Sequence, residues 1–136
     1  MQKFKTTCAI VLNKNNEALL IKRGREPFKD YWALVSGIGE SKKGVPPDDA
    51  IKGEIAGDLG TKSFVGSQIF SLPVKNDETT DEVIVYVGRI NESEIVFKPG
   101  YSEDFRWVAM DKLVLENLAF EHTDIIKKYL NEKNSD

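Results

Sequence analysis

The chain has 136 residues, of which 40% are apolar and 30% charged, a composition typical of a globular domain with its own core. Its net charge of −3 creates no general positive field, so nucleic acid is not an expected partner. No apolar run approaches the roughly 18 residues of a membrane span, and the N-terminus has no signal-peptide pattern. The single cysteine, Cys8, excludes an internal disulfide and favours a reducing compartment. We therefore expect one cytoplasmic domain over residues 1–136, with a frayed polar tail at 131–136 and no membrane contact.

Apolar and β-branched runs predict most of the strands. The turn residues at 14–16 separate the first two runs, which are therefore expected to pair as a hairpin. Breaks at Gly66 and Pro73 interrupt and end a later run. The predicted strands cover 6–12, 18–22, 32–35, 64–72, 83–90 and 105–109.

A helix is predicted from near Pro47 to Gly60, after a loop over 36–46. Proline in a first helical turn loses no hydrogen bond, and acidic residues such as Asp48 suit the positive end of the helix dipole. Gly60 can adopt the left-handed conformation that closes a helix. Local chemistry therefore predicts both ends of this helix.

Two more helices are predicted towards the C-terminus, one capped by Asp111 and running to Leu118, the other beginning at Thr123. The order of strands, one helix, strands and then helices differs from the regular alternation of a doubly wound sheet. We therefore expect an α+β fold in which helices sandwich a mixed β-sheet.

The run EPFKDYWALVSGIGES at 26–41, followed by a helix with Glu54 and Asp58, resembles the Nudix hydrolases. Their signature is Gly, five residues, Glu, seven residues, and then Arg-Glu-apolar-x-Glu-Glu-x-Gly-apolar. Gly37 matches the first glycine, and Glu40 matches the glutamate usually found three residues later. The resemblance covers most of the chain and implies a Nudix-like α/β/α sandwich with a mixed sheet.

The chain departs from that signature at several positions. Two extra residues, assigned to Lys42 and Lys43, precede the point where the match resumes. The usual Pro-Gly before the first glycine is also absent. The replaced positions are Val45 for the first Glu, Gly53 for the Arg, Gly57 for the first Glu of the pair and Asp58 for the second.

The resemblance implies a divalent metal site on the helix. In this family, helix carboxylates hold Mg²⁺ or Mn²⁺ on a diphosphate, where the ion neutralises charge and activates water. Here Glu54 and Asp58 would hold one ion, with the carbonyl of Gly37. A second ion lacks the carboxylate that Gly57 replaces. Without the surrounding resemblance to the Nudix signature, two acidic residues four positions apart are typical of a solvated helix face.

The two helix glycines allow two interpretations. Either their strip packs closely against a backbone, or it has lost catalytic side chains and leaves a wider cleft. Gly53 cannot orient neighbouring glutamates as the family's arginine does. Lys42 or Lys43 in the inserted loop could instead pair with Glu40.

Other charged residues are candidates for substrate contacts. Arg23, Arg25 and Lys29 flank the expected cleft and could bind phosphate oxygens, and Glu40 is grouped with them. Besides Glu54, the resemblance implies a catalytic carboxylate from a loop, and Glu103 is our candidate. The alternatives are Glu78, Asp81, Glu82 and Asp104.

Two single residues have simpler interpretations. His122, the only histidine, precedes the last helix and is expected to be a cap or a surface residue. Cys8, on the first predicted strand, is expected in the core.

Two functions are compatible with this pattern. The first is a metal-dependent hydrolase that cleaves a nucleoside diphosphate linked to another group, of the ADP-ribose or nucleotide-sugar class. The second is a Nudix-fold module that binds a nucleotide but has lost efficient turnover. Both take a small-molecule nucleotide, and both are compatible with a homodimer. The surviving Glu54 favours the enzyme, whereas Val45, Gly53 and Gly57 favour the module.

Overall fold

A computed structural model describes residues 2–134 of the chain. In this part of the chain, the strands are β1 (Phe4–Val11), β2 (Glu17–Arg23), β3 (Trp32–Ala33), β4 (Val35–Gly37), β5 (Val65–Pro73), β6 (Thr80–Arg89) and β7 (Ser102–Ala109). The helices are α1 (Gly39–Lys42), α2 (Pro47–Leu59), the 3₁₀ turn η1 (Glu92–Glu94), α3 (Met110–Leu113) and α4 (His122–Asn134).

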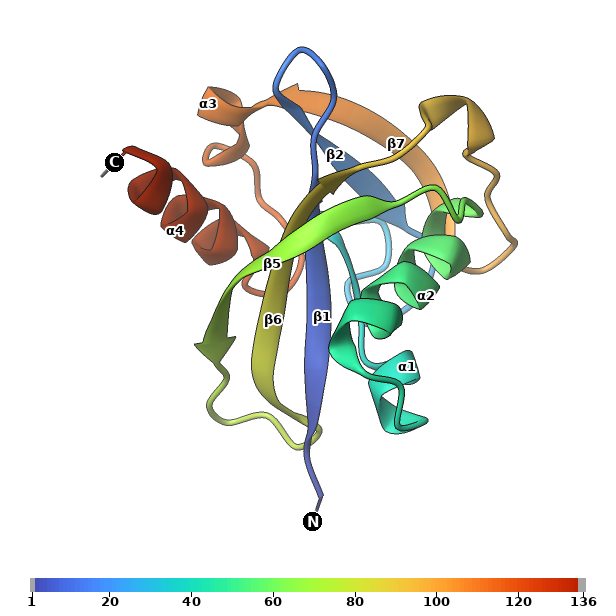
Figure 1. The fold of residues 1–136 in the computed structure, drawn as a ribbon, viewed down its shortest axis with the longest axis vertical. Helices are drawn as coiled ribbons and strands as arrows, with labels where there is room; N and C mark the ends of the chain where they lie inside the picture. Colours follow the sequence, from blue (N-terminus) through green and yellow to red (C-terminus); the bar gives the residue numbers. More distant parts are fainter. Residues whose placement is uncertain (1, 135–136) are drawn as a thin grey trace.

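The strands form two sheets with helices on opposite sides (Figure 1). One sheet has the order β4-β1-β6-β5 and is mixed, because β1 and β6 are parallel while the other pairs are antiparallel. The other has the order β3-β2-β7 and is antiparallel. In Figure 1, α4 and α2 lie on either side of the strands. The predicted α+β architecture with a mixed sheet between helices is confirmed.

Strand β1 is buried on both faces. Cys8 and Ile10 point into a core that includes Ile125 and Ile126 of α4. Successive side chains of a strand point to opposite faces, so the intervening Ala9 enters the second core, under α2. The prediction that Cys8 is a core residue is confirmed, because its side chain is fully buried.

The prediction that the first two strands pair with each other as a hairpin is wrong. A single bridge joins Leu12 to Ala18, and the strands then separate into different sheets. β1 pairs with β4 and β6, whereas β2 pairs with β3 and β7. Turn residues predict a chain reversal, but a strand that is apolar on both faces pairs along both of its edges inside a sheet.

Helix α2 begins and ends as predicted. Pro47 occupies its first turn, and Gly60 ends it in the left-handed conformation with φ of 72°. The carbonyl of Val96 occupies the space of a side chain at Gly60, which is a second reason for glycine there. Ile51 and Ile55 are buried against the sheet, so the opposite face of α2 is available for a site.

The segments around α3 and α4 differ from the prediction. α3 ends at Leu113, and Asp111 lies within its first turn rather than at its cap, which is Ala109. Leu118 instead lies beside Trp32 in a parallel bridge, so tertiary contact with another loop overrides helix propensity. α4 continues to Asn134, into the tail expected to fray, and residues 135–136 lie outside the described part. No helix of the described chain is long and apolar enough to cross a membrane.

Candidate metal and nucleotide site

Glu54 lies where α2 meets the turn between β4 and α1. Its carboxylate occupies the space that a side chain at residue 37 would need, so in this arrangement only glycine fits at that position. The backbone N–H of Glu40 donates to Glu54 Oε1 at 3.1 Å. These contacts hold Glu54 against Gly37, the two residues expected to share a metal.

The side chain of Glu40 covers Gly53. A Cβ atom at residue 53 would lie 2.6 Å from Glu40 Oε1, closer than side chains approach one another. Lys43 Nζ lies 3.9 Å from Glu40 Oε2, which confirms a lysine of the inserted loop as the partner of Glu40. The neighbour of Gly53 is therefore a side chain rather than the backbone that close packing predicted.

Gly57, one turn further along α2, has more room. The nearest atom to a Cβ at this position would be Cε1 of Tyr101 at 3.8 Å, an ordinary contact distance. The two helix glycines are thus different, because a Cβ atom at Gly57 would fit without displacing a neighbour.

Asp58 is the buried acid of the site, with 8% of its surface exposed. Burial, and after it the negative charge of Glu54, raise the pKa of its carboxyl group to about 7. Arg25 and Arg23 act in the opposite direction and lower this pKa. Glu54, Asp58 and the two arginines therefore share one small region.

These side chains fit a single divalent cation with few protein ligands. Mg²⁺ and Mn²⁺ prefer carboxylate and carbonyl oxygens, and a cation beside Asp58 would relieve its repulsion with Glu54. Within residues 2–134, no group of three or more His, Cys, Asp or Glu side chains could hold a metal. The donor set therefore suits one ion that keeps much of its water shell, rather than an all-protein cage.

Aromatic rings hold the two arginines near Asp58. The guanidinium of Arg25 lies 4.5 Å from the ring centroid of Tyr101, and that of Arg23 lies 4.9 Å from the centroid of Phe120. The N–H of Gly24, between the arginines, donates to the carbonyl of Tyr101 at 2.8 Å. Two of the three predicted phosphate-binding residues are thus beside the carboxylates.

Lys29 is separate from this group. It lies in the exposed loop between β2 and β3, where its backbone N–H donates to Glu26 Oε1 at 3.1 Å. No contact of the described residues joins Lys29 to Glu54 or Asp58, so the structure does not bring it to the carboxylates.

The candidate loop carboxylates lie in different places. Glu103 is beside the arginine loop, since a Cβ at Gly24 would lie 3.2 Å from its Cγ. Asp81 and Glu82 belong to β6, across β1 from β4, and pair with Lys5 at 3.8 and 2.8 Å. Glu103 therefore lies near the arginines, and its catalytic role stays a prediction.

The expectation that His122 is a cap or surface residue is wrong. Its ring is buried, and Nδ1 accepts a hydrogen bond from the N–H of Leu34 at 3.1 Å. Nε2 lies 3.3 Å from Ser36 Oγ, to which it donates when Nδ1 is the acceptor. Burial lowers the pKa of His122 to about 3, with Arg23 adding to the effect, so the ring is neutral. Sequence reasoning missed this contact because a lone histidine carries no spacing signal.

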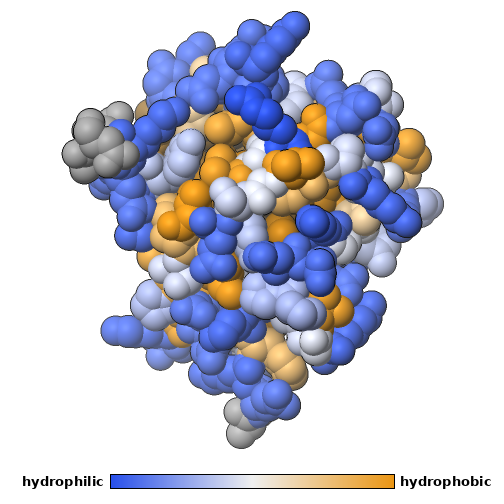
Figure 2. All heavy atoms as spheres, viewed as in Figure 1, coloured by the Kyte–Doolittle hydropathy of each residue, from blue (hydrophilic) through white to orange (hydrophobic). Residues whose placement is uncertain are grey.

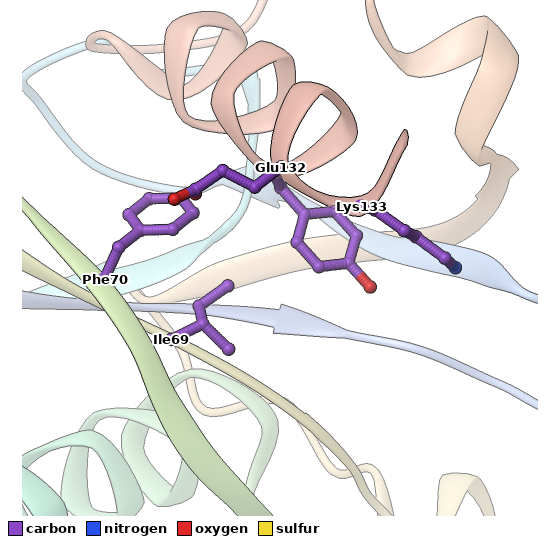
Figure 3. A pocket seen from close by; sticks show the side chains of 5 residues that line it. Ile69, Phe70, Glu132 and Lys133 are labelled. Atoms are coloured by element: carbon purple, nitrogen blue, oxygen red, sulfur yellow. The ribbon is translucent and has the colours of Figure 1, made fainter. Parts of the chain in front are cut away.

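Two hollows lie beside other parts of the fold. One, of about 300 Å³, lies between β5 and α4; Figure 3 shows Ile69 and Phe70 reaching from β5 towards the helix that carries Glu132 and Lys133. Figure 2 shows several patches of hydrophobic residues on this face of the molecule, with hydrophilic residues between and around them. The other, of about 290 Å³, is lined by Lys52, Gly53, Ala56, Lys62 and Phe64. This second hollow shows that the surface of α2 at Gly53 is open beside the part that the side chain of Glu40 covers.

Comparison with known proteins identifies the family. The NUDIX domain model matches residues 2–129, nearly the whole chain. An ADP-ribose pyrophosphatase of Methanocaldococcus jannaschii is 33% identical over 129 residues, which are 91% of this chain and 72% of that protein. The chain therefore belongs to the NUDIX family, whose hydrolases generally use divalent metals.

Solved structures share the fold. The NUDIX domain of Shewanella oneidensis NrtR, solved with ADP ribose, superimposes with a TM-score of 0.77 at 15% identity and covers 97% of this chain and 89% of that one. The MutT protein of Methanosarcina mazei has a TM-score of 0.66 at 17% identity over 98% of both chains. Together with the sheet and helix arrangement, these similarities confirm a Nudix fold.

Proposed function

We propose that this protein is a hydrolase that cleaves the diphosphate of a nucleoside diphosphate linked to another group, with ADP-ribose and nucleotide sugars as the substrate class. The observation that carries the proposal is the carboxylate pair Glu54 and Asp58 beside the guanidinium groups of Arg23 and Arg25. The 33% identity to an ADP-ribose pyrophosphatase supports the substrate class.

The substrate diphosphate is bound by charge. Arg23 and Arg25 are held on aromatic rings and can donate to phosphate oxygens in charge-assisted hydrogen bonds. Glu54 and Asp58, with the carbonyl of Gly37, would hold Mg²⁺ or Mn²⁺ against the same diphosphate. When bound, such an ion neutralises phosphate charge and lowers the pKa of a nearby water.

The remaining residues position groups or move a proton. We assign Glu103 as the general base that removes a proton from the attacking water, because it borders the arginine loop. The water oxygen bonds to one phosphorus, the bridging P–O bond breaks, and a nucleotide and a phosphorylated second product leave. We assign Glu40 to orienting Glu54, through the N–H donated to its carboxylate, and to substrate contacts at the mouth of the site.

A hydrolysis screen tests this proposal. Purified protein is incubated with Mg²⁺ or Mn²⁺ and ADP-ribose, nucleotide sugars, dinucleotides or nucleoside triphosphates, and the products are separated. We expect ADP-ribose to yield AMP and ribose 5-phosphate, and Glu54→Gln to reduce the rate by roughly 10²-fold or more. Rates no higher than in protein-free buffer for every compound would end the proposal.

A nucleotide-binding module is the second candidate, and the glycine at residue 57 favours it. Gly57 removes one carboxylate from the helix, and Val45 removes another from the preceding loop. A module would bind nucleotides equally well after Glu54→Gln and show no turnover in either protein. Efficient hydrolysis by the unaltered protein would exclude it.

A further inference from the structure

Three aromatic rings lie together on the surface beside the proposed site. Phe28 and Tyr31 come from the loop between β2 and β3, and Phe120 from the turn before α4. Ring centroids are 5.4 Å apart for Phe28 and Tyr31 and 4.8 Å apart for Phe28 and Phe120. The residues are 38%, 42% and 43% exposed, so much of this aromatic platform faces solvent. Contiguous exposed apolar surface of this kind is typical of a ligand-binding surface.

Two rings of the platform are held by unfavourable backbone conformations. Phe28 has φ of 62° and Phe120 has φ of 56°, values that bulky L-residues rarely adopt. Burial does not explain these conformations, because both side chains remain partly exposed. Unfavourable backbone that persists away from a core is concentrated at ligand clamps and active sites.

The platform is connected to the carboxylates through Arg23 and Arg25. The guanidinium of Arg23 stacks over Phe120, and its Nε donates to the carbonyl of Pro27 at 2.7 Å. Arg25, two residues further along this loop, stacks over Tyr101 at 4.5 Å. The ring of Tyr101 lies 3.8 Å from the Cβ position of Gly57, the residue before Asp58 on α2, so the arginine loop borders both the rings and the carboxylate pair. Phe120 also contacts the ring of His122, with centroids 5.4 Å apart.

Along this surface, the flat aromatic rings are followed by an arginine and then by carboxylates of the kind that bind divalent metals. A nucleotide presents matching groups in the same order: a planar base, a ribose and negatively charged phosphates. Stacking on an aromatic side chain is available to every base, since each has a π-face. Arg23 can contact the phosphates on one side and remain stacked on Phe120 on the other.

We propose that the aromatic platform of Phe28, Tyr31 and Phe120 binds the nucleobase of the substrate by stacking. The proposal rests on the proposed function for the position of the diphosphate. It extends that function by assigning to these rings the discrimination between a nucleotide and a sugar phosphate. The second product, a phosphorylated sugar, gains nothing from the platform because it has no planar ring.

The test uses the two products expected from ADP-ribose, which share a ribose phosphate and differ in the base. Calorimetric titrations measure the Kd of AMP and of ribose 5-phosphate for the wild type, Phe120→Leu and Phe28→Leu. Phe70→Leu is the matched control, because Phe70 is partly buried in the hollow beside α4. Thermal melting checks that each variant is folded, and the two platform variants lie in different loops, so either can carry the test.

We expect the wild type to bind AMP roughly 5- to 100-fold more tightly than ribose 5-phosphate, the range expected for stacking of one base. Each platform variant should lose much of that preference without a change in the Kd of ribose 5-phosphate, and Phe70→Leu should keep it. An unchanged AMP affinity in folded platform variants would overturn the proposal. Hydrolysis of ADP-ribose is followed in the same samples. If the wild type does not hydrolyse ADP-ribose but the platform variants lose the preference for AMP, the proposed function is refuted and the platform is supported.

Discussion

At the scale of single residues, the site depends on one glutamate and its immediate contacts. Glu54 Oε1 accepts the N–H of Glu40, and the carboxylate fills the space beside Gly37. A glutamine at residue 54 could keep the hydrogen bond because its amide oxygen is also an acceptor. The substitution Glu54→Gln therefore removes a negative charge while preserving a contact that positions the side chain.

Manganese should stabilise the wild type but not Glu54→Gln. A ligand that binds only the native state adds about 2.7 kcal/mol to the free energy of unfolding at 100 times its Kd. The measurement is the melting temperature with and without Mn²⁺. Asp49→Asn, an exposed acid of the same helix, is the control and should keep the wild-type shift. An undiminished shift in Glu54→Gln would place the ion elsewhere.

His122 should make the protein less stable as the pH falls below about 6.5. Its pKa is lowered from 6.5 to about 3, so the unfolded chain binds a proton that the native state refuses between these values. The expected loss is up to about 1.4 kcal/mol per pH unit from this one group. Asp58 has the opposite trend, because its raised pKa makes the native state take up a proton first.

The comparison with His122→Gln isolates the histidine contribution. Denaturant unfolding at pH 5, 6 and 7 gives the free energy of unfolding of both proteins. The difference in the free energy of unfolding between wild type and variant should be largest at pH 7 and shrink as the pH falls, since only the wild type can be protonated at residue 122. A gap that is constant over this range would show that the native ring is protonated as readily as the unfolded one.

At the scale of secondary-structure elements, α2 has one buried side and carries two interior glycines whose neighbours differ. Its buried side faces the sheet, and its other side carries the carboxylates together with Gly53 and Gly57. Interior glycine costs a helix roughly 1 kcal/mol relative to alanine. Whether alanine recovers that amount depends on what lies beside each glycine.

Gly57→Ala should stabilise the protein by about 0.5–1 kcal/mol, because its new methyl group meets Tyr101 at an ordinary distance. Gly53→Ala should gain less or destabilise, since its methyl group would displace the side chain of Glu40. Chemical denaturation of the two variants measures both effects, and each variant is the control for the other. Equal gains would mean that Glu40 moves away from α2 without cost.

Gly57→Glu tests whether the helix has lost a metal ligand. Glutamate at this position restores a carboxylate near Glu54 and Asp58, and its Cβ atom would meet Tyr101 at an ordinary contact distance of 3.8 Å. Additional ligand charge strengthens the binding of hard cations, so the Kd for Mn²⁺ should fall severalfold. Gly57→Gln is the isosteric control. If the glutamine variant tightens binding equally, charge at residue 57 is not the cause.

At the scale of the whole molecule, β1 organises the fold. It is paired on both edges and separates a core under α4 from a core under α2. Cys8 sits on this strand with no exposed surface, and burial raises the pKa of its thiol. Modification of this thiol therefore requires the central strand to open.

Cys8 should react with a thiol reagent only as fast as the whole molecule unfolds. The rate of labelling in native buffer is compared with the unfolding rate from denaturant jumps extrapolated to water. Denatured chains serve as the control and should label immediately, with one thiol per chain. Labelling that is much faster than global unfolding would reveal local opening of β1.

Elements with local signals are predictable from the amino-acid sequence alone. Proline, acidic residues and glycine predict both ends of α2 because capping acts within a single turn. Apolar runs predict the strands because side-chain alternation is a property of the strand itself. The spacing of Gly37, Glu54 and Asp58 indicated the family, and comparison confirmed it.

The tertiary structure sets the features that depend on residues far apart in the chain. It placed β1 and β2 in different sheets, since strand pairing depends on which edges and faces are buried. It buried His122 against Leu34, 88 residues away, where no local pattern could indicate a partner. It also laid Glu40 over Gly53 and brought Phe120 to Phe28 and Arg23. Such contacts arise only when distant segments fold together, so residue types and spacing within one segment do not encode them.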